Sequence, residues 1–156
     1  MSLLGLPETW RTAIFNATGV AIGSGSLPTF AGRRLRYDSL GVLSYEAASF
    51  NFFSYAASGI GTTSLGNNSY VTGSTLSNTL SGWLAIDGLF SGFASGNASG
   101  SLYLYLEASP DGGTTWPTPA SANGPGGGLL IGVIGYGSTT TVSTASTTQR
   151  IYVTFP

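Results

Sequence analysis

Residues 101–108, with the sequence SLYLYLEA, constrain the fold more than any other part of the chain. Aliphatic residues alternate there with aromatic or acidic ones: Leu102, Leu104 and Leu106 against Tyr103, Tyr105 and Glu107. Because successive side chains of a strand point to opposite faces, this pattern predicts a strand with one aliphatic face. A strand with one buried face and one more polar face is typical of an antiparallel sheet.

Shorter apolar or β-branched runs, separated by Gly and Ser, indicate further strands. They cover residues 81–92, 129–136, 139–143 and 150–155. Residues 45–57 are also interpreted as a strand, although their Ala, Glu and Phe content leaves a short helix open, and residues 117–128, PTPASANGPGGG, must form a loop. Many short strands with Gly/Ser turns predict an all-β fold, an antiparallel β-sandwich or jelly-roll-like domain.

The charged residues divide the chain into two parts. Residues 1–38 carry four arginines against two acids, a net charge of +2, whereas residues 39–156 carry one arginine against four acids, a net charge of −3. The first part also contains several Gly and Pro residues. We therefore expect an extended N-terminal arm over residues 1–40 and a β-sandwich domain over residues 41–156.

The arm would end in the basic sequence GRRLR. If this segment is extended, Arg34 and Arg36 share one face and Arg33 lies on the other. The three arginines form either a solvated charge cluster or a docking contact for an acidic neighbour. The arm also carries Trp10 and Phe15, and because large aromatic and Arg side chains dominate interface energies, all five residues are candidate docking residues.

The residue types that the chain lacks exclude most catalytic mechanisms. It has no histidine and no cysteine, and its five basic residues are all arginines. Ser-His-Asp and Cys-His nucleophiles are therefore impossible, as is a Walker A loop, which needs lysine. No cluster of carboxylates supplies enough oxygen ligands for calcium. We predict a protein that is not an enzyme and has no cofactor, metal or catalytic residue.

The low charge of the chain also bears on its partners. Charged residues make up 7% of the chain, against about 25% in ordinary domains. The surface is therefore expected to be covered by other copies or by a partner, or else to be wetted by hydroxyl and backbone groups. The longest apolar run, residues 129–136, is too short to span a bilayer, and the sparse cations argue against nucleic acid, so neither partner is expected.

Residues 109–116 contain the most specific motif, with the spacing S-x-D-x-G-x-T-W. Its positions are Ser109, Asp111, Gly113, Thr115 and Trp116, with Gly112 following the aspartate. Asp-Gly is a strong hairpin-turn signal, and the carboxylate can accept hydrogen bonds from the following backbone. We expect a structural hairpin in which Thr115 restarts the strand and Trp116 folds back onto the domain. The spacing resembles the Asp-box of sialidases and other β-propellers, where the motif lies away from catalysis.

A longer stretch, residues 83–117, resembles small β-sandwich virion proteins of tailed bacteriophages. The matching positions are Gly100, Leu102, Tyr103, Leu104, Tyr105, Leu106, Ser109, Asp111, Gly112, Gly113, Trp116 and Pro117. The resemblance implies a structural protein of the virion, foremost a capsid decoration (cement) protein. It would bind the major capsid protein or other virion proteins and form a homo-oligomer, with a trimer favoured.

Two other functions remain open from the sequence. A neck, tail or fibre component of the particle would share the same composition and the same hairpin motif. A carbohydrate-binding or receptor-binding module would use exposed Trp and Tyr side chains, although alternating aromatic residues are more often found in a core or an interface.

Overall fold

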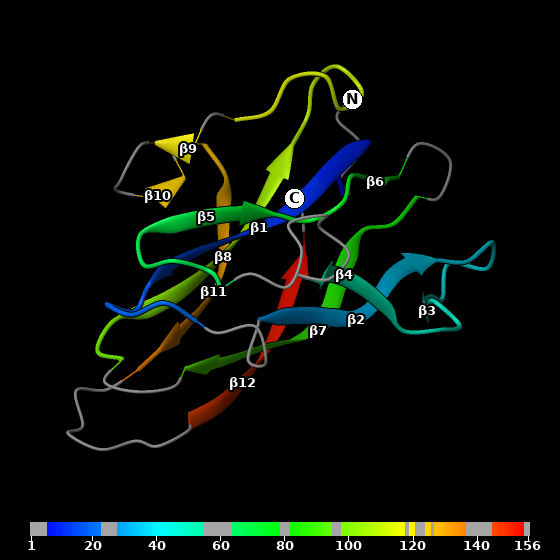
Figure 1. Ribbon diagram of the computed structural model, residues 1–156. Coiled ribbons are helices and arrows are strands. Elements are labelled where there is room, and N and C mark those ends of the chain that lie inside the picture. The colour runs from blue at the N-terminus through cyan, green and yellow to red at the C-terminus, as the bar shows by residue number, and fades with distance from the viewer. Residues whose placement is uncertain are drawn as a thin grey trace.

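The computed structural model describes residues 6–22, 28–54, 64–78, 82–94, 98–117, 119–120, 124–125, 127–136 and 145–154. Their secondary structure is entirely β, with no helix in these segments. Two antiparallel sheets pack face to face and form a β-sandwich (Figure 1). The described residues therefore contain no helix long and apolar enough to cross a membrane.

The first sheet has five strands in the order β11-β8-β1-β5, with β6 also paired to β1. Their bounds are β1 (Thr9–Ala17), β5 (Ser69–Thr72), β6 (Leu76–Ser77), β8 (Ser101–Ala108) and β11 (Leu129–Gly135). The β8 strand pairs with β1 over its whole length, from Ala108 opposite Trp10 to Ser101 opposite Ala17.

The second sheet also has five strands, in the order β12-β7-β2-β3, with β4 paired to the other end of β2. Their bounds are β2 (Thr29–Tyr37), β3 (Leu43–Tyr45), β4 (Phe50–Ser54), β7 (Ala85–Ala94) and β12 (Ala145–Thr154). A separate ribbon pairs β9 (Pro119–Ala120) with β10 (Gly124–Pro125).

The hydrophobic core lies between the two sheets. The predicted aliphatic face of β8 is buried: Leu102 and Leu104 are fully inaccessible and Leu106 is nearly so. Trp10 and Ile14 of β1 join them, and Phe30, Phe52 and Phe90 face them from the second sheet: the Trp10 and Phe52 ring centroids lie 5.9 Å apart. Each such side chain contributes roughly 1.5–3 kcal/mol by its burial.

Two glycines set how closely the sheets approach each other. A Cβ atom on Gly92 of β7 would lie 2.7 Å from Leu102 Cδ1, and one on Gly132 of β11 would lie 2.6 Å from Ile151 Cδ1. Both separations are too short for a carbon–carbon contact. The glycines therefore provide the room that the large core side chains occupy.

The predicted antiparallel β-sandwich is confirmed, whereas the jelly-roll connectivity stays a prediction. The expected arm over residues 1–40 is wrong for its described part. Within it, β1 lies between β8 and β5 in the first sheet, and β2 lies between β7 and β3 in the second. The inward alternation of Trp10, Thr12 and Ile14 is a strand pattern, which the Gly, Pro and charge content of the segment obscured.

Several local predictions can also be compared with the structure. Of residues 45–57, the structure describes 45–54, which contain the last residue of β3, a bent connection over 46–49 and the strand β4, so the alternative of a short helix is wrong there. Residues 150–154 fall in the longer strand β12, while residue 155 and the strand expected at 139–143 lie outside the described residues. The loop expected at 117–128 contains the two-residue strands β9 and β10.

Candidate interaction surface

Arg34 is a structural residue of the second sheet. Two nitrogens of its guanidinium donate to the two carboxylate oxygens of Glu46: Nε donates to Oε2 at 3.0 Å, and Nη2 donates to Oε1. Its guanidinium also lies 5.1 Å from the Phe50 ring centroid and 5.0 Å from that of Trp83. The hydrogen bond from Arg34 lowers the pKa of Glu46 below its usual value. Arg34 is thus occupied within the chain.

The predicted division of the three arginines between two faces of the strand agrees with the contacts. Arg36 lies over the same Trp83 ring as Arg34, at 4.8 Å. Arg33 pairs in register with Asp87 on β7 and lines the outer face of the second sheet. The Arg33 side chain is exposed, and no acidic residue in the described part of the chain pairs with it.

The two aromatic residues predicted to anchor the arm are not available to a partner. Trp10 is fully buried in the core. Phe15 is 7% exposed and packs beside Tyr103 in the first sheet, with ring centroids 6.3 Å apart. The prediction that Trp10 and Phe15 dock onto a neighbour is therefore wrong, because β1 places both against their own domain.

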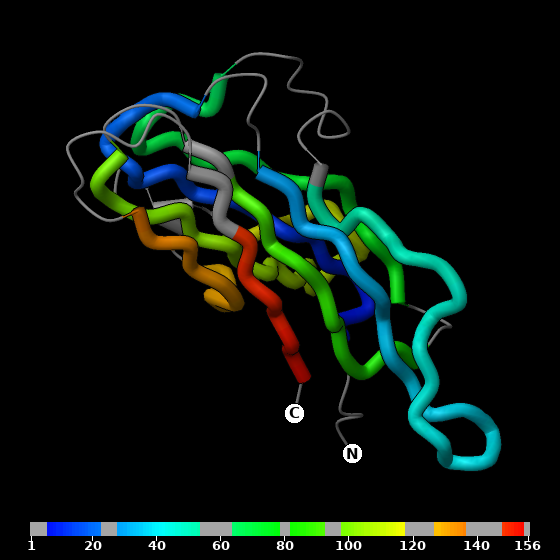
Figure 2. Tube along the Cα trace, turned by 90° about the horizontal axis from the view of Figure 1, so that it is seen from below, coloured from blue at the N-terminus to red at the C-terminus, as the bar shows by residue number. Residues whose placement is uncertain are grey.

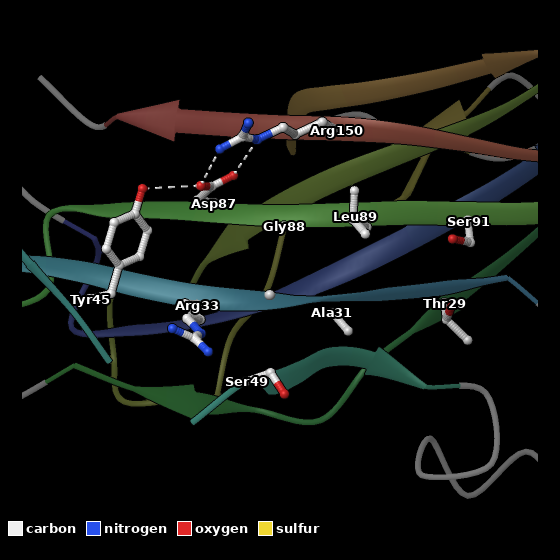
Figure 3. A pocket seen from close by; sticks show the side chains of 11 residues that line it. Thr29, Ala31, Arg33, Tyr45, Ser49, Asp87, Gly88, Leu89, Ser91 and Arg150 are labelled. Atoms are coloured by element: carbon white, nitrogen blue, oxygen red, sulfur yellow. Dashed lines mark hydrogen bonds and ion pairs between the residues drawn. The ribbon is translucent and has the colours of Figure 1, made fainter. Parts of the chain in front are cut away.

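An open groove of about 620 Å³ lies on the outer face of the second sheet (Figure 3). It is lined by residues of β2, β7 and β12, by Tyr45 of β3 and by Ser49: Thr29, Ala31, Gly32, Arg33, Tyr45, Ser49, Asp87, Gly88, Leu89, Ser91 and Arg150. Glycines and short side chains form much of its floor, so the backbone of the central strands β2 and β7 is within reach of a ligand or partner.

One ion pair organises the groove at its Tyr45 end. Arg150 donates from Nε to Asp87 Oδ1 at 2.9 Å and from Nη2 to Oδ2 at 2.7 Å, and the Tyr45 hydroxyl donates to Oδ2 at 3.3 Å (Figure 3). The hydrogen bonds from Arg150 lower the pKa of Asp87. With Arg33 and Arg150 against Asp87, the groove carries a net charge of +1.

Exposed apolar side chains are concentrated on this same side of the molecule. Among the described residues, ten large hydrophobic side chains are exposed, and seven of them belong to the second sheet and its β2–β3 turn. These seven, which we call the apolar face, are Tyr37, Leu40, Val42, Leu43, Tyr45, Leu89 and Tyr152. The other three are Leu129, Leu130 and Val133, all on β11.

The β2–β3 hairpin, residues 34–46, holds part of the apolar face away from the body of the domain (Figure 2). Asp38 closes its turn by accepting the N–H groups of Leu40 and Val42 at Oδ1, both at 2.9 Å, and Gly41 adopts φ of 76°. At the base, Glu46 N–H donates to the Arg34 carbonyl. Leu40 is nevertheless 86% exposed at the tip. The hairpin is a well-bonded element with an apolar tip in solvent.

The 109–116 motif forms a compact loop with the expected bonds. Asp111 Oδ1 accepts from the Ser109 hydroxyl at 2.8 Å and from Thr115 N–H at 2.7 Å. Ser109 Oγ accepts from Gly113 N–H, and Trp116 Nε1 donates to the Gly113 carbonyl at 2.9 Å. The positive φ values of Gly112 and Gly113, 72° and 100°, explain both glycines.

The motif is not a tight hairpin between two strands, because β8 pairs next with β11, which begins at Leu129. Thr115 therefore does not restart a strand, contrary to the prediction. Trp116 does fold back as expected: Arg11 Cζ lies 4.1 Å from the centroid of its ring. The loop thus covers part of the outer face of the first sheet.

Beneath this cover lies a buried charge that the sequence did not indicate. Glu107, on the more polar face of the predicted strand, is fully inaccessible and accepts from Arg11 Nε at 2.6 Å and from the Tyr70 hydroxyl. Burial, followed by the bond to Glu107, raises the pKa of Tyr70 strongly. Alternation placed Glu107 on the face of Tyr103 and Tyr105, but its partner Arg11 lies 96 residues away in sequence.

The described residues contain no group of three or more His, Cys, Asp or Glu side chains that could hold a metal ion. The buried Glu107 is fully bonded to its partners, and the exposed groove offers an arginine, hydroxyls and apolar groups. These groups suit binding through hydrogen bonds, charge and apolar contact. No protein-family model, curated protein or solved structure matches the chain.

Proposed function

We propose that the chain is a structural protein of a tailed-phage virion, and most specifically a capsid decoration (cement) protein. It would act by binding the major capsid protein, or another virion protein, and stabilising the shell. The resemblance of residues 83–117 to phage virion proteins motivates the proposal. The observation that carries it is the apolar face on a chain with only 7% charged residues.

The apolar face supports an interaction role for a physical reason. Exposed apolar patches rimmed by polar groups mark interaction surfaces, since isolated soluble proteins rarely leave such surface uncovered. The β2–β3 hairpin adds a preorganised contact, because its turn is already fixed by Asp38 and its base by the Arg34–Glu46 pair. A preorganised element loses little conformational entropy when it binds.

Within this proposal the chain is a component of the particle and forms a homo-oligomer, the trimer being the form implied by the resemblance. A neck, tail or fibre position is compatible with the same surface. The docking role proposed for the basic segment falls on Arg33, since Arg34 and Arg36 lie against Trp83.

A carbohydrate-binding or receptor-binding module is the second candidate. The groove favours it, because Tyr45, Asp87 and Arg33 present a ring, an acceptor and a donor around one open cavity. Polar planar groups beside an aromatic ring suit the hydroxyl groups and apolar face of a sugar. A glycan array screened at high protein concentration tests this candidate directly.

The test of the main proposal is binding to capsids of the phage that encodes the chain, prepared without this protein. We expect the wild-type chain to occupy the shell and to raise its melting temperature. The Leu40→Asp/Val42→Asp variant changes two exposed side chains and leaves the hydrophobic core intact. We expect it to bind the shells less. Failure of the wild-type chain to bind such shells, together with binding to a glycan, would replace the proposal with the second candidate.

A further inference from the structure

We propose that the β2–β3 hairpin of one copy docks into the groove on the second sheet of another copy of this chain. The inference rests on the proposed function, because it names the contact through which copies of the virion protein associate. It is carried by three features of the described residues: a preformed apolar projection, an open groove, and opposite charges on the hairpin tip and the groove.

The charges are complementary between the surfaces. The groove carries a net charge of +1, and its exposed Arg33 has no acidic partner in the described part of the chain. The hairpin tip, residues 37–43, carries a single charge, the exposed carboxylate of Asp38. An interface that joins these surfaces brings an unpaired guanidinium close to a carboxylate.

The apolar groups are also matched. Leu40 and Val42 at the tip are 86% and 58% exposed, and Gly41 between them has no atom within 4 Å of the position of a Cβ. In the groove, Leu89 is 52% exposed beside Ala31 and the bare backbone of Gly88. The groove has a volume of about 620 Å³, within the range of roughly 300–1,000 Å³ that is typical of ligand-binding clefts.

The two surfaces are continuous within one chain, which favours a second copy as the occupant. Tyr45 belongs to both surfaces: it lines the groove, and it pairs with Leu35 in the β2–β3 hairpin. A chain that presents both halves of a contact on adjoining surfaces can associate with itself. Reciprocal exchange of hairpins closes at two copies, and passing the hairpin around a ring closes at three or more.

The first test compares two leucines of nearly equal exposure by sedimentation equilibrium of the full chain. Leu43 on the hairpin is 45% exposed, and Leu130 on β11 is 47% exposed. We expect Leu43→Arg to weaken self-association at least about tenfold, because it would bring a second cation against the positively charged groove and its Arg33 guanidinium. Leu130→Arg, the matched control, should associate as the wild type does. Circular dichroism confirms that both variants remain folded.

The second test uses two variants that fail alone and associate when mixed. Leu40→Arg places a cation on the hairpin, where it would meet Arg33 of the groove. Arg33→Glu places an anion in the groove, where it would meet Asp38 of the hairpin. Each variant should remain monomeric by itself. A one-to-one mixture should associate again, because the altered hairpin then meets the altered groove of the other variant. A reciprocal pair of the two variants has both contacts matched.

Three results would overturn the inference: a wild-type monomer at every concentration tested, equal weakening by Leu130→Arg, or a mixture that stays monomeric. The proposed function is judged separately by capsid binding. If the chain binds capsids as a monomer, the proposed function stands and the hairpin–groove contact is refuted. If the chain self-associates through this contact but does not bind capsids, the contact stands and the proposed function is refuted.

Discussion

The outer faces of the two sheets differ in what covers them. On the first sheet, the 109–116 loop folds back so that Trp116 lies over Arg11, and Glu107 beneath is fully buried. Gly128 adds to this cover, since a Cβ there would lie 3.4 Å from Glu107 Cγ. On the second sheet, Leu89, Tyr45 and Tyr152 remain about half exposed.

The difference indicates that the outer face of the first sheet contributes to folding stability, whereas the outer face of the second sheet is available to a partner. The covered face contains a buried, fully bonded charge, and removing one member of such a group is costly. The bare face contains exposed side chains, whose replacement changes folding stability little. Substitutions on the first face should therefore affect folding, and substitutions on the second should affect association.

The largest effect is expected from Glu107→Gln. The change removes the negative charge that Arg11 and Tyr70 share and leaves the Arg11 guanidinium, 17% exposed, without a counter-ion. Breaking a buried pair in this way costs about 3–5 kcal/mol in the free energy of unfolding. Urea denaturation measures the loss. A loss below about 1 kcal/mol, the range of an exposed pair, would show that the group is not truly buried.

A smaller loss is expected from Trp116→Ala, which uncovers Arg11 and removes the hydrogen bond to the Gly113 carbonyl. The expected cost is about 1–2 kcal/mol. Tyr152→Ala is the control aromatic on the bare face, where the side chain is 54% exposed, and should cost less than about 0.5 kcal/mol. Equal losses from the two variants would remove the distinction between the faces.

The cover itself is expected to depend on pH through Asp111. Hydrogen bonds from Thr115 and then Ser109 lower the pKa of Asp111 to about 2, below the value of about 3.9 for an unfolded chain. Because the folded-state pKa is the lower one, the carboxylate stabilises the fold above about pH 4, and the contribution is lost as pH falls toward 2.

The measurement is the difference in melting temperature between the wild type and Asp111→Asn at several pH values. The difference should be largest near pH 6 and should shrink between pH 4 and pH 2. A difference that is constant over this interval would mean that Asp111 does not hold the loop through its charge.

The smallest effect on stability is expected from Leu40→Arg at the hairpin tip. Its side chain is 86% exposed, so the free energy of unfolding should change by less than about 0.5 kcal/mol. Self-association through the groove should nevertheless be lost. A large loss of stability in a monomeric sample would show that the tip packs against its own chain.

The sequence predicted features that depend on neighbours along the strand. Alternation located the buried leucines of β8, and the extended geometry of residues 32–36 separated Arg33 from Arg34 and Arg36. Features that depend on distant partners were missed. Trp10 was assigned to an arm because local Gly, Pro and charge content outweighed the alternation, and the burial of Glu107 depends on Arg11 and Trp116, which only the folded sheet brings together.

The bare second sheet could not be predicted for a similar reason. The sequence shows apolar residues at 37–45, and nothing local distinguishes a core strand from one that faces solvent. The β8–β11 connection decides the matter, because its described part returns over the first sheet, and no other described segment covers the outer face of the second.

The most direct test of the central claim is hydroxyl-radical footprinting of the tyrosines, with the protein free and in its assembled, particle-bound form. Tyr37, Tyr45 and Tyr152 report on the second sheet, and Tyr103 and Tyr105 report on the first. We predict that assembly protects members of the first group, Tyr37 and Tyr45 above all, and leaves Tyr103 and Tyr105 unchanged. Protection confined to Tyr103 and Tyr105 would contradict the account and place the interaction surface on the first sheet.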